Sequence, residues 1–419
     1  MASIVLSFVG SQDPESLDTK KEGSIVTLVN HLLKNNQQLK QIILLYTKET
    51  KNNAHLTQEW LKEYLSVDQV KLIPVSEKFS TDPIDVALAT QEARKALEEA
   101  RNLANNDIFE FNSSSGTPPM KAAWGILQAS GYAKNSRLWQ VRNPNKMAPE
   151  QELVFENNVN IFKNEADLRV IKKQLQNYNY QGAADSLDNS DFNSSIAKVL
   201  LKYGYCRLSF DFKSAKELIT PYQLEIKSQL IDNIALLGDN SILDLLQEVY
   251  YKSVTKIRTK QYADFLVLLF AFQENILRFL VQKKVLNVNS SQLDWKGIEN
   301  QVRSKIKQGK LGEYIQNYQT SNGQLLRVEG ELSRIVLLAI LEFFDDLSEL
   351  VILLKKIESY CNLRNDWVHN LKGVSFLENE KEILGTIREI LEKVKPDFNP
   401  VNPFNLLNEE ILNYLTKSS

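Results

Sequence analysis

The hydrophobic pattern changes once along the chain, near residue 150, and this change limits the folds available to it. Before residue 150, short apolar runs alternate with amphipathic helical patterns, which is the order of a parallel, doubly wound sheet. Strands are expected at 4–9, 41–46, 69–75, 107–112 and 137–142, with helices near 23–35, 56–65, 83–103 and 118–130. This part is therefore expected to form a Rossmann-like α/β domain.

After residue 150, apolar residues recur at helical spacing almost throughout. Helices are expected at 167–178, 194–202, 214–237, 242–257, 261–284, 295–307, 333–361 and 380–394. A polar stretch at 238–240 separates two groups of these helices. We therefore expect an α/β domain at 1–150, an all-α linker domain at 151–238 and a second helical domain at 239–419.

Composition and charge exclude several classes of protein. The chain has 50 basic and 52 acidic residues, so any affinity for nucleic acid must come from a local basic surface. Its longest apolar stretch, 265–272, is shorter than the ~20 residues that cross a bilayer, and its start lacks a signal-peptide pattern. Cys206 and Cys361 lack patterned ligand partners. We expect a cytoplasmic protein with no metal site and no membrane association.

Two polar loops follow strands of the expected sheet. The first strand runs into Gly10, Ser11 and Gln12, and the fourth into the segment 113–120, which is rich in hydroxyl groups and opens a helix. Ligands of such sheets bind beyond the carboxyl ends of the strands, where backbone N–H groups and a helix N-terminus can receive a phosphate. The alternative is a turn whose Ser and Thr residues only cap the helix. Neither GxGxxG nor GxxxxGK[ST] occurs, which argues against a dehydrogenase and a P-loop NTPase.

A second candidate site lies at 364–369, where Arg364, Asn365 and His369 fall within about two helical turns. Cleavage of RNA needs a proton moved near neutral pH and a phosphoryl charge stabilised, tasks that suit His and Arg. The alternative is an exposed helix end. The spacing alone leaves both interpretations open.

Together these segments resemble the CARF–HEPN ribonucleases of type III CRISPR systems, especially the Csm-type accessory ribonuclease. FVGSQDP opens the α/β domain, SSSGTPPM follows its fourth strand, and QVRNP ends its fifth. The helix QYADFLVLLFAFQENILRFL is similar to an early helix of the HEPN domain, and RNDWVH matches the R-x4-6-H signature. The resemblance covers nearly the whole chain, and it implies a CARF sensor, an all-α linker and a HEPN domain.

The family's activity is RNA cleavage switched on by a cyclic oligoadenylate, which the type III CRISPR effector complex makes. The resemblance implies that this activator is the one small molecule required, as a tetra- or hexa-adenylate ring, the tetramer being commoner among relatives. It implies a homodimer, since a ring of even symmetry satisfies two identical pockets. The implied ligand-binding residues are Gly10, Ser11, Gln12, Ser113, Ser114, Ser115, Gly116, Thr117, Pro118, Met120 and Arg142.

The implied reaction is metal-free attack of an RNA 2'-hydroxyl on the adjacent phosphorus, giving a 2',3'-cyclic phosphate. His369 would transfer the proton, Arg364 would stabilise the phosphate charge, and Asn365 would orient the imidazole or the phosphate. In some relatives the sensor also cuts its activator, which would give Ser114, Ser115 or Thr117 a positioning role, although many relatives carry Thr where this loop has Ser. Two rival functions stay open: a catalytically silent, messenger-responsive regulator, and a HEPN toxin with another trigger.

Overall fold

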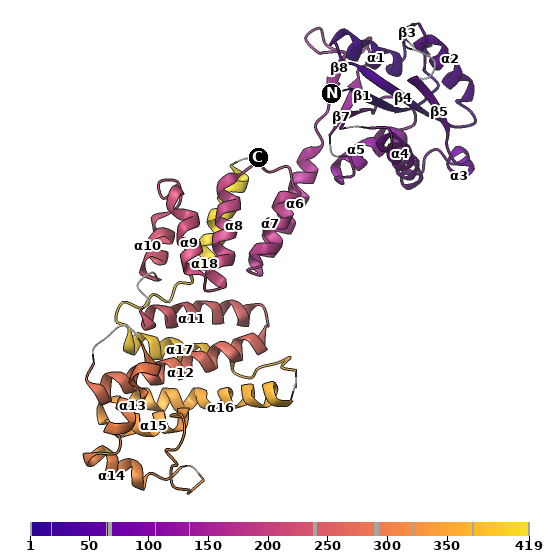
Figure 1. Ribbon diagram of the computed structural model, residues 1–419. Coiled ribbons are helices and arrows are strands. Elements are labelled where there is room, and N and C mark those ends of the chain that lie inside the picture. The colour runs from indigo at the N-terminus through magenta and orange to yellow at the C-terminus, as the bar shows by residue number, and fades with distance from the viewer. Residues whose placement is uncertain are drawn as a thin grey trace. The chain divides into compact units, whose positions relative to one another are not determined.

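The computed structural model describes residues 2–417 except 18, 64, 66–68, 105, 134, 238–240, 289–292, 321 and 371–372, and it leaves the side chains of 160, 359 and 361–370 undescribed. Contacts divide the chain into two compact units, 1–167 and 168–419 (Figure 1). The first unit is α/β and the second is helical. The expected order, α/β followed by all-α, is confirmed.

The first unit is built on a six-stranded sheet in the order β5-β4-β1-β6-β7-β8. Its strands are β1 (Ser3–Phe8), β4 (Leu39–Tyr46), β5 (Val70–Pro74), β6 (Ile108–Asn112), β7 (Ser136–Val141) and β8 (Val154–Glu156). Every pairing is parallel except the one between β7 and β8. Because β1 lies between β4 and β6, the chain reverses its direction of winding there, which creates the crevice where doubly wound sheets bind ligands.

Helices cover both faces of this sheet because side chains alternate along each strand. Ile4, Leu6 and Phe8 of β1 pack against α4 (Val86–Arg101) and α5 (Pro118–Ala129). Val5 and Val9 share a core with α1 (Ser24–Lys34) and α2 (Lys51–Leu61) on the other face. The short helix α3 (Glu77–Thr81) precedes α4. The five expected strands and four expected helices are all present, with ends shifted by a few residues.

Three strands of this unit were not expected from the sequence. β2 (Glu15–Ser16) and β3 (Lys21–Glu22) form a small antiparallel hairpin after the first loop. β8 lies at the edge of the main sheet, paired with β7, and is only three residues long. Such a short strand shows too little alternation to be found by its pattern. The α/β unit therefore extends beyond residue 150, and its last strand lies inside the segment expected to be linker.

The second unit is helical in all its described elements except an isolated bridge between Gln319 and Leu325. Its helices are α6 (Asn160–Gln176, which begins in the first unit), α7 (Tyr180–Asp188), α8 (Ser195–Leu208), α9 (Phe212–Ile219), α10 (Ser228–Leu236), α11 (Ile242–Arg258), α12 (Tyr262–Leu286), α13 (Trp295–Lys305), α14 (Gly309–Asn317), α15 (Arg334–Glu342), α16 (Ser348–Asn370), α17 (Glu380–Val394) and α18 (Pro403–Thr416). The second expected boundary, at 238–240, lies outside the described residues.

Two long helices expected from periodicity are each divided in two. The segment 214–237 forms the end of α9 and then α10, with a short 3-10 helix (Thr220–Tyr222) between them. Pro221 lies in this break, where its ring prevents the helix from continuing. The segment 333–361 divides into α15 and α16 around a second 3-10 helix, Asp345–Leu347. Apolar spacing continued across both breaks, so periodicity alone did not reveal them.

The last helix, α18, returns to the helices that follow the α/β unit. It packs against α8 and α10 (Figure 1). Tyr178 and Tyr180 donate their hydroxyls to Asn405 and Asn408 of α18, at 2.8 and 2.9 Å. The last helix, α18, therefore packs among the helices that were expected to form the linker. Residues from α6 to α18 share one hydrophobic core.

Candidate functional site: a cavity at the edge of the sheet

A cavity of about 470 Å³ lies at the carboxyl ends of β1, β4, β6 and β7. Three loops that follow these strands line it: 9–13 after β1, 114–117 after β6 and 141–144 after β7. The N-terminal ends of α1, α2 and α5 also line it, through Ser24, Thr50 and Thr117. The cavity occupies the crevice where the winding of the sheet reverses, which is where a ligand of such a fold binds.

The three helix N-termini give the cavity its electrostatic character. None of these helices has an acidic residue in its first turn, so each keeps a partial positive charge at its N-terminus, although α5 opens with two prolines that have no N–H and the Ile25 amide of α1 bonds to Asp13. The ionisable side chains that line the cavity nearly balance: Asp13, Glu22 and Glu49 against Lys121 and Arg142. An anionic ligand would therefore be received mainly by backbone groups and helix ends.

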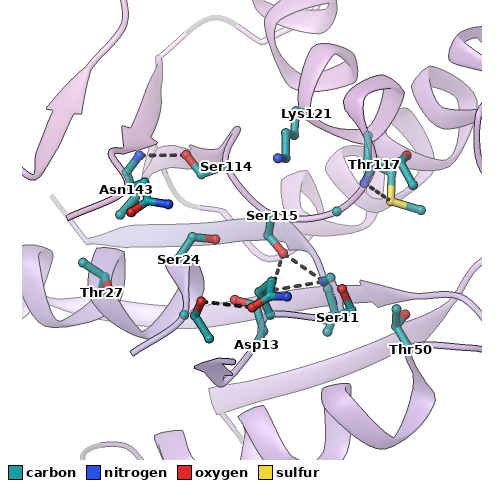
Figure 2. Close-up of a pocket in the computed structure, with 18 of the residues that line it drawn as sticks. Ser11, Asp13, Ser24, Thr27, Thr50, Ser114, Ser115, Thr117, Lys121 and Asn143 are labelled. Carbon is teal, nitrogen blue, oxygen red and sulfur yellow. Dashed lines mark hydrogen bonds between the residues drawn. The ribbon is translucent and has the colours of Figure 1, made fainter. Parts of the chain in front are cut away.

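Asp13 joins the loop after β1 to the loop after β6. Its side chain is only 2% exposed. One carboxylate oxygen accepts from the Gly10 amide, at 3.0 Å, and from the Ser115 hydroxyl, and the other accepts from the Ile25 amide of α1, at 3.2 Å. The Ser115 hydroxyl also accepts from the Gly10 amide, at 2.9 Å (Figure 2). Burial raises the pKa of Asp13, and these hydrogen bonds and Lys121 oppose the increase.

Two glycines allow these loops to approach so closely. A Cβ atom on Gly10 would lie 2.8 Å from the backbone nitrogen of Gly116, closer than such atoms can pack. Gly116 has φ +89°, a conformation that favours glycine, and a Cβ there would lie 2.6 Å from the sulfur of Met120. The Thr117 amide donates to this sulfur at 3.4 Å, where α5 begins. Glycine is therefore required at both positions by contact, and at Gly116 by conformation as well.

The hydroxyls of the 113–117 loop have different partners. Ser113 is buried and donates to the Trp139 carbonyl at 3.0 Å. The Ser114 hydroxyl accepts from the Val141 amide at 2.7 Å, and the Thr117 hydroxyl donates to the Pro83 carbonyl at 2.7 Å. Arg142 donates to the Glu152 carbonyl at 2.5 Å, and its guanidinium lies 3.7 Å from the centre of the Phe155 ring of β8. Strand β8, which was not expected from the sequence, therefore holds Arg142 beside the cavity.

The structure brings together nine of the eleven expected ligand-binding residues. Those that line the cavity are Gly10, Ser11, Gln12, Ser114, Ser115, Gly116, Thr117, Met120 and Arg142. Ser113 and Pro118 do not line it: Ser113 is bonded to β7, and Pro118 occupies the first turn of α5, where its missing N–H is tolerated. Sequence reasoning missed Asp13, Ser24, Thr27, Thr47, Thr50, Lys121 and Asn143, which also line the cavity. Asp13 had a signal, since it directly follows Gln12.

The second candidate site, Arg364, Asn365 and His369, lies on the last turns of α16, but its side chains are outside the described residues. Earlier parts of α16 are fixed by a buried amide. Gln273 of α12 donates to the Leu354 carbonyl at 2.9 Å, and Arg334 of α15 donates to Gln273 at 2.7 Å. Burial raises the pKa of Glu358, on the same helix. Two helices, α12 and α15, thus hold the first part of α16, the helix that carries the motif.

Two structural features are absent from the described residues. No helix there is long and apolar enough to cross a membrane. No group of three or more His, Cys, Asp or Glu side chains there is arranged to hold a metal ion.

Comparison with known proteins agrees with both units. The structure is similar to that of Enterococcus italicus Csm6 bound to cyclic hexa-2'-fluoro-hexa-dAMP, with a TM-score of 0.71, 18% identity, and coverage of 99% of this chain and 100% of that chain. At this identity the likeness shows the fold. Residues 239–417 match the family model of the Cas_Csm6 HEPN domain. The C-terminal part of the chain belongs to the Csm6 HEPN family. No protein in the curated set matches it.

The family model assigns a domain to the C-terminal part of the helical unit. The family model covers α11 to α18, including the motif helix α16, so a HEPN ribonuclease domain begins close to the expected boundary at 238–240. The α/β unit, with its cavity, shares its fold with the Enterococcus protein. The resemblance inferred from the sequence motifs is confirmed, and it assigns the chain an accessory ribonuclease role in type III CRISPR systems.

Proposed function

We propose that this protein is a single-stranded RNA endoribonuclease of type III CRISPR antiviral defence, activated by a cyclic oligoadenylate. The observation that carries the proposal is the union, in one chain, of a Csm6 HEPN domain with a sheet-edge cavity lined by helix N-termini. We assign the sensor to 1–167, the linker helices to 168–238 and the nuclease to 239–417. The nuclease acts in the cytoplasm, where the effector complex releases its messenger.

The activator is a ring of adenylates, whose phosphates are received by the N–H groups around the cavity. The similar Enterococcus protein binds an analogue with six adenylates, so cyclic hexa-adenylate is the first ring to test, with the tetramer beside it. A ring of either size has two-fold symmetry and fits a C2 homodimer that presents two identical cavities. The homodimer also brings two copies of Arg364, Asn365 and His369 into one composite cleft.

The chemistry follows from these three residues and needs no metal. The 2'-oxygen of the RNA attacks the adjacent phosphorus, the bond to the 5'-oxygen breaks, and the 2'-proton ends on that leaving oxygen. The products are a 2',3'-cyclic phosphate and a 5'-hydroxyl. His369 moves the proton, since its ordinary pKa lies near ~6.5. Arg364 stabilises the charge on the phosphate, and Asn365, four residues before His369, shares a helical face with it.

A second activity is proposed for the sensor itself, namely slow cutting of the activator. Of the three hydroxyls considered, Ser115 donates to Asp13 and Thr117 to Pro83. Ser114 accepts from the Val141 amide, and no described residue receives its hydrogen. Ser114 is therefore best suited to orient a 2'-hydroxyl of the ring. His369→Ala protein incubated with cyclic hexa-adenylate should form linear products, and His369→Ala/Ser114→Ala protein should form few. Equal product from both would remove Ser114 from this role.

The main experiment titrates the full chain with cyclic tetra- and hexa-adenylate while a fluorescent single-stranded RNA is followed. We expect cleavage only with a ring present, cyclic phosphate ends on the products, and full activity in EDTA. His369→Ala should lower the rate at least ~10²-fold, the usual share of proton transfer in catalysis. His55→Ala is the matched control, since His55 is exposed on α2 and does not line the cavity.

The same titration separates the rival functions. A wild-type protein that binds a ring but never cleaves RNA is a regulator. A protein that cleaves RNA at the same rate with and without rings is a HEPN ribonuclease with another trigger. Loss of wild-type activity in EDTA would contradict the metal-free reaction.

A further inference from the structure

Asp13 is a buried carboxylate that the proposed reaction and ligand contacts leave unused. It is 2% exposed, and it forms no ion pair with a described residue. Its acceptor sites are instead filled by donors from three separate segments: the Gly10 amide, the Ser115 hydroxyl and the Ile25 amide. An anion site should avoid a carboxylate, because like charges repel. The presence of Asp13 in the lining of this cavity therefore requires an explanation other than contact with the ligand.

The reason lies in what a carboxylate can do that other side chains cannot. An ionised carboxylate is acceptor-only and has about four lone-pair sites, so it can receive all three donors at once. An amide of the same shape would present its own N–H groups to one of them. The loops joined in this way carry Gly10, Ser11, Gln12, Ser114 and Gly116, all of which line the cavity. Gly23, at the start of α1, touches Gln12 and Asp13 so closely that a Cβ there would overlap them.

We propose that Asp13 is a positioning residue of the activator site, whose carboxylate fixes the Gly10 amide, the Ser115 hydroxyl and the start of α1 in the arrangement that receives the ring. The inference rests on the proposed function, because it takes the cavity as the activator site. Burial raises the pKa of Asp13, the direction expected of a carboxylate held for its geometry at an electrostatic cost.

The test compares Asp13→Ala and Asp13→Asn in the full chain. Alanine removes all three acceptor bonds. Asparagine keeps the shape and the bond from Ile25 but turns an N–H toward Gly10. The control is Glu110→Gln, the same change at another buried carboxylate of this sheet, which is 0% exposed, accepts from Ser3, Arg137 and Trp139, and does not line the cavity. Circular dichroism establishes that each variant is folded.

The readout is the concentration of cyclic hexa-adenylate that gives half-maximal RNA cleavage, with the maximal rate recorded separately. We expect this concentration to rise at least about tenfold in Asp13→Ala, the scale of losing a charge-assisted bond to a buried group, and about threefold in Asp13→Asn. Saturating activator should recover most of the rate in both. Glu110→Gln should stay within about twofold of wild type, because its bonds lie outside the cavity.

Two results would overturn the inference. One is a half-activating concentration that neither Asp13 variant changes. The other is complete rescue by asparagine, which would show that the shape at this position matters and the carboxylate does not. If wild type itself fails to respond to any ring, the proposed function fails instead. Amide hydrogen exchange at 9–13 and 24–27 then decides the inference: faster exchange in Asp13→Ala than in Glu110→Gln supports it, and equal exchange refutes it.

Discussion

Two buried carboxylates, Asp13 of the α/β unit and Glu248 of the helical unit, have very different partners. Glu248, in the helical unit, is 3% exposed and forms two bonds with the guanidinium of Arg207, itself 2% exposed. Arg207 also donates to the Tyr203 hydroxyl at 2.7 Å. Asp13, in the α/β unit, is equally buried yet accepts only from uncharged donors.

The difference suits two roles: Glu248 joins helices of a core, and Asp13 joins loops that line a cavity. Burial lowers the pKa of the Arg207 guanidinium, but Tyr203 and Glu248 outweigh this and raise it overall, so Arg207 stays charged. Its bonds join α8 to α11, and the Phe404 ring of α18 lies 5.5 Å away, so the pair connects three helices of one core. The donors to Asp13 belong to loops that line a cavity. The ion-paired carboxylate therefore joins helices of a core, whereas the carboxylate without a cation joins loops of the proposed activator site.

The largest effect that tests this comparison is expected from Arg207→Ala. Removing the guanidinium leaves Glu248 buried without a cation, which should lower the free energy of unfolding of the helical unit by about 3–5 kcal/mol. Urea denaturation of the full chain, followed by circular dichroism, measures it. Binding of cyclic hexa-adenylate to the α/β unit should persist under conditions in which that unit stays folded.

A matched control is Lys198→Ala, which removes an ion pair with Asp188 whose side chains are 45% and 64% exposed. Solvent screens such a pair, so the change should be below about 1 kcal/mol. The double variant Arg207→Met/Glu248→Leu should recover much of the lost stability, because it leaves no charge unpaired. A small effect of Arg207→Ala alone would break the distinction between the two carboxylates.

A smaller effect, confined to the cavity, is expected from Gly10→Ala. The added Cβ would lie 2.8 Å from the Gly116 nitrogen, so the two loops must move apart at a cost of about 1–3 kcal/mol. The half-activating concentration of cyclic hexa-adenylate should rise roughly tenfold or more, as measured by RNA cleavage.

Gly125→Ala provides the comparison. A Cβ on Gly125, within α5, would make an ordinary contact of 3.5 Å with Leu138, and alanine favours the helix. We expect unchanged activation and a stability equal to or above that of wild type. An equal loss of activation in both glycine variants would mean that the close approach of the two loops has no special role.

Local sequence patterns were sufficient to predict the main strands of the sheet and the loops that line the cavity. The apolar runs at 4–9 and 107–112 are central strands, and in a doubly wound sheet the ends of such strands must meet. The contribution of Asp13 was not predictable in this way. It depends on Ser115, 102 residues away in the sequence, which no local pattern connects to it. The edge strand β8 and the breaks in the long helices were missed because each involves too few residues.

For the nuclease motif the situation is reversed: the sequence identified the residues, but the described structure does not include their side chains. Arg364, Asn365 and His369 were singled out by their spacing and given roles by the resemblance, and the family model of the HEPN domain covers them. Their chemistry is a prediction, because it depends on a second copy of the same residues and on side chains outside the described part of the chain. The cavity could be described from contacts within one chain. The proposed nuclease cleft requires two chains.

The smallest expected effect, and the one most specific to Asp13, is a dependence on pH. Burial raises the pKa of Asp13 above its ordinary value of 3.8, so folding favours the protonated form. The stability that this provides is present at low pH and is lost as pH rises through the pKa of the folded protein. The free energy of unfolding of wild type, minus that of Asp13→Asn, should therefore decrease between about pH 4 and 7. Urea denaturation at several pH values measures this difference. An increase with pH would mean that the donors from Gly10, Ser115 and Ile25 more than offset the cost of burial.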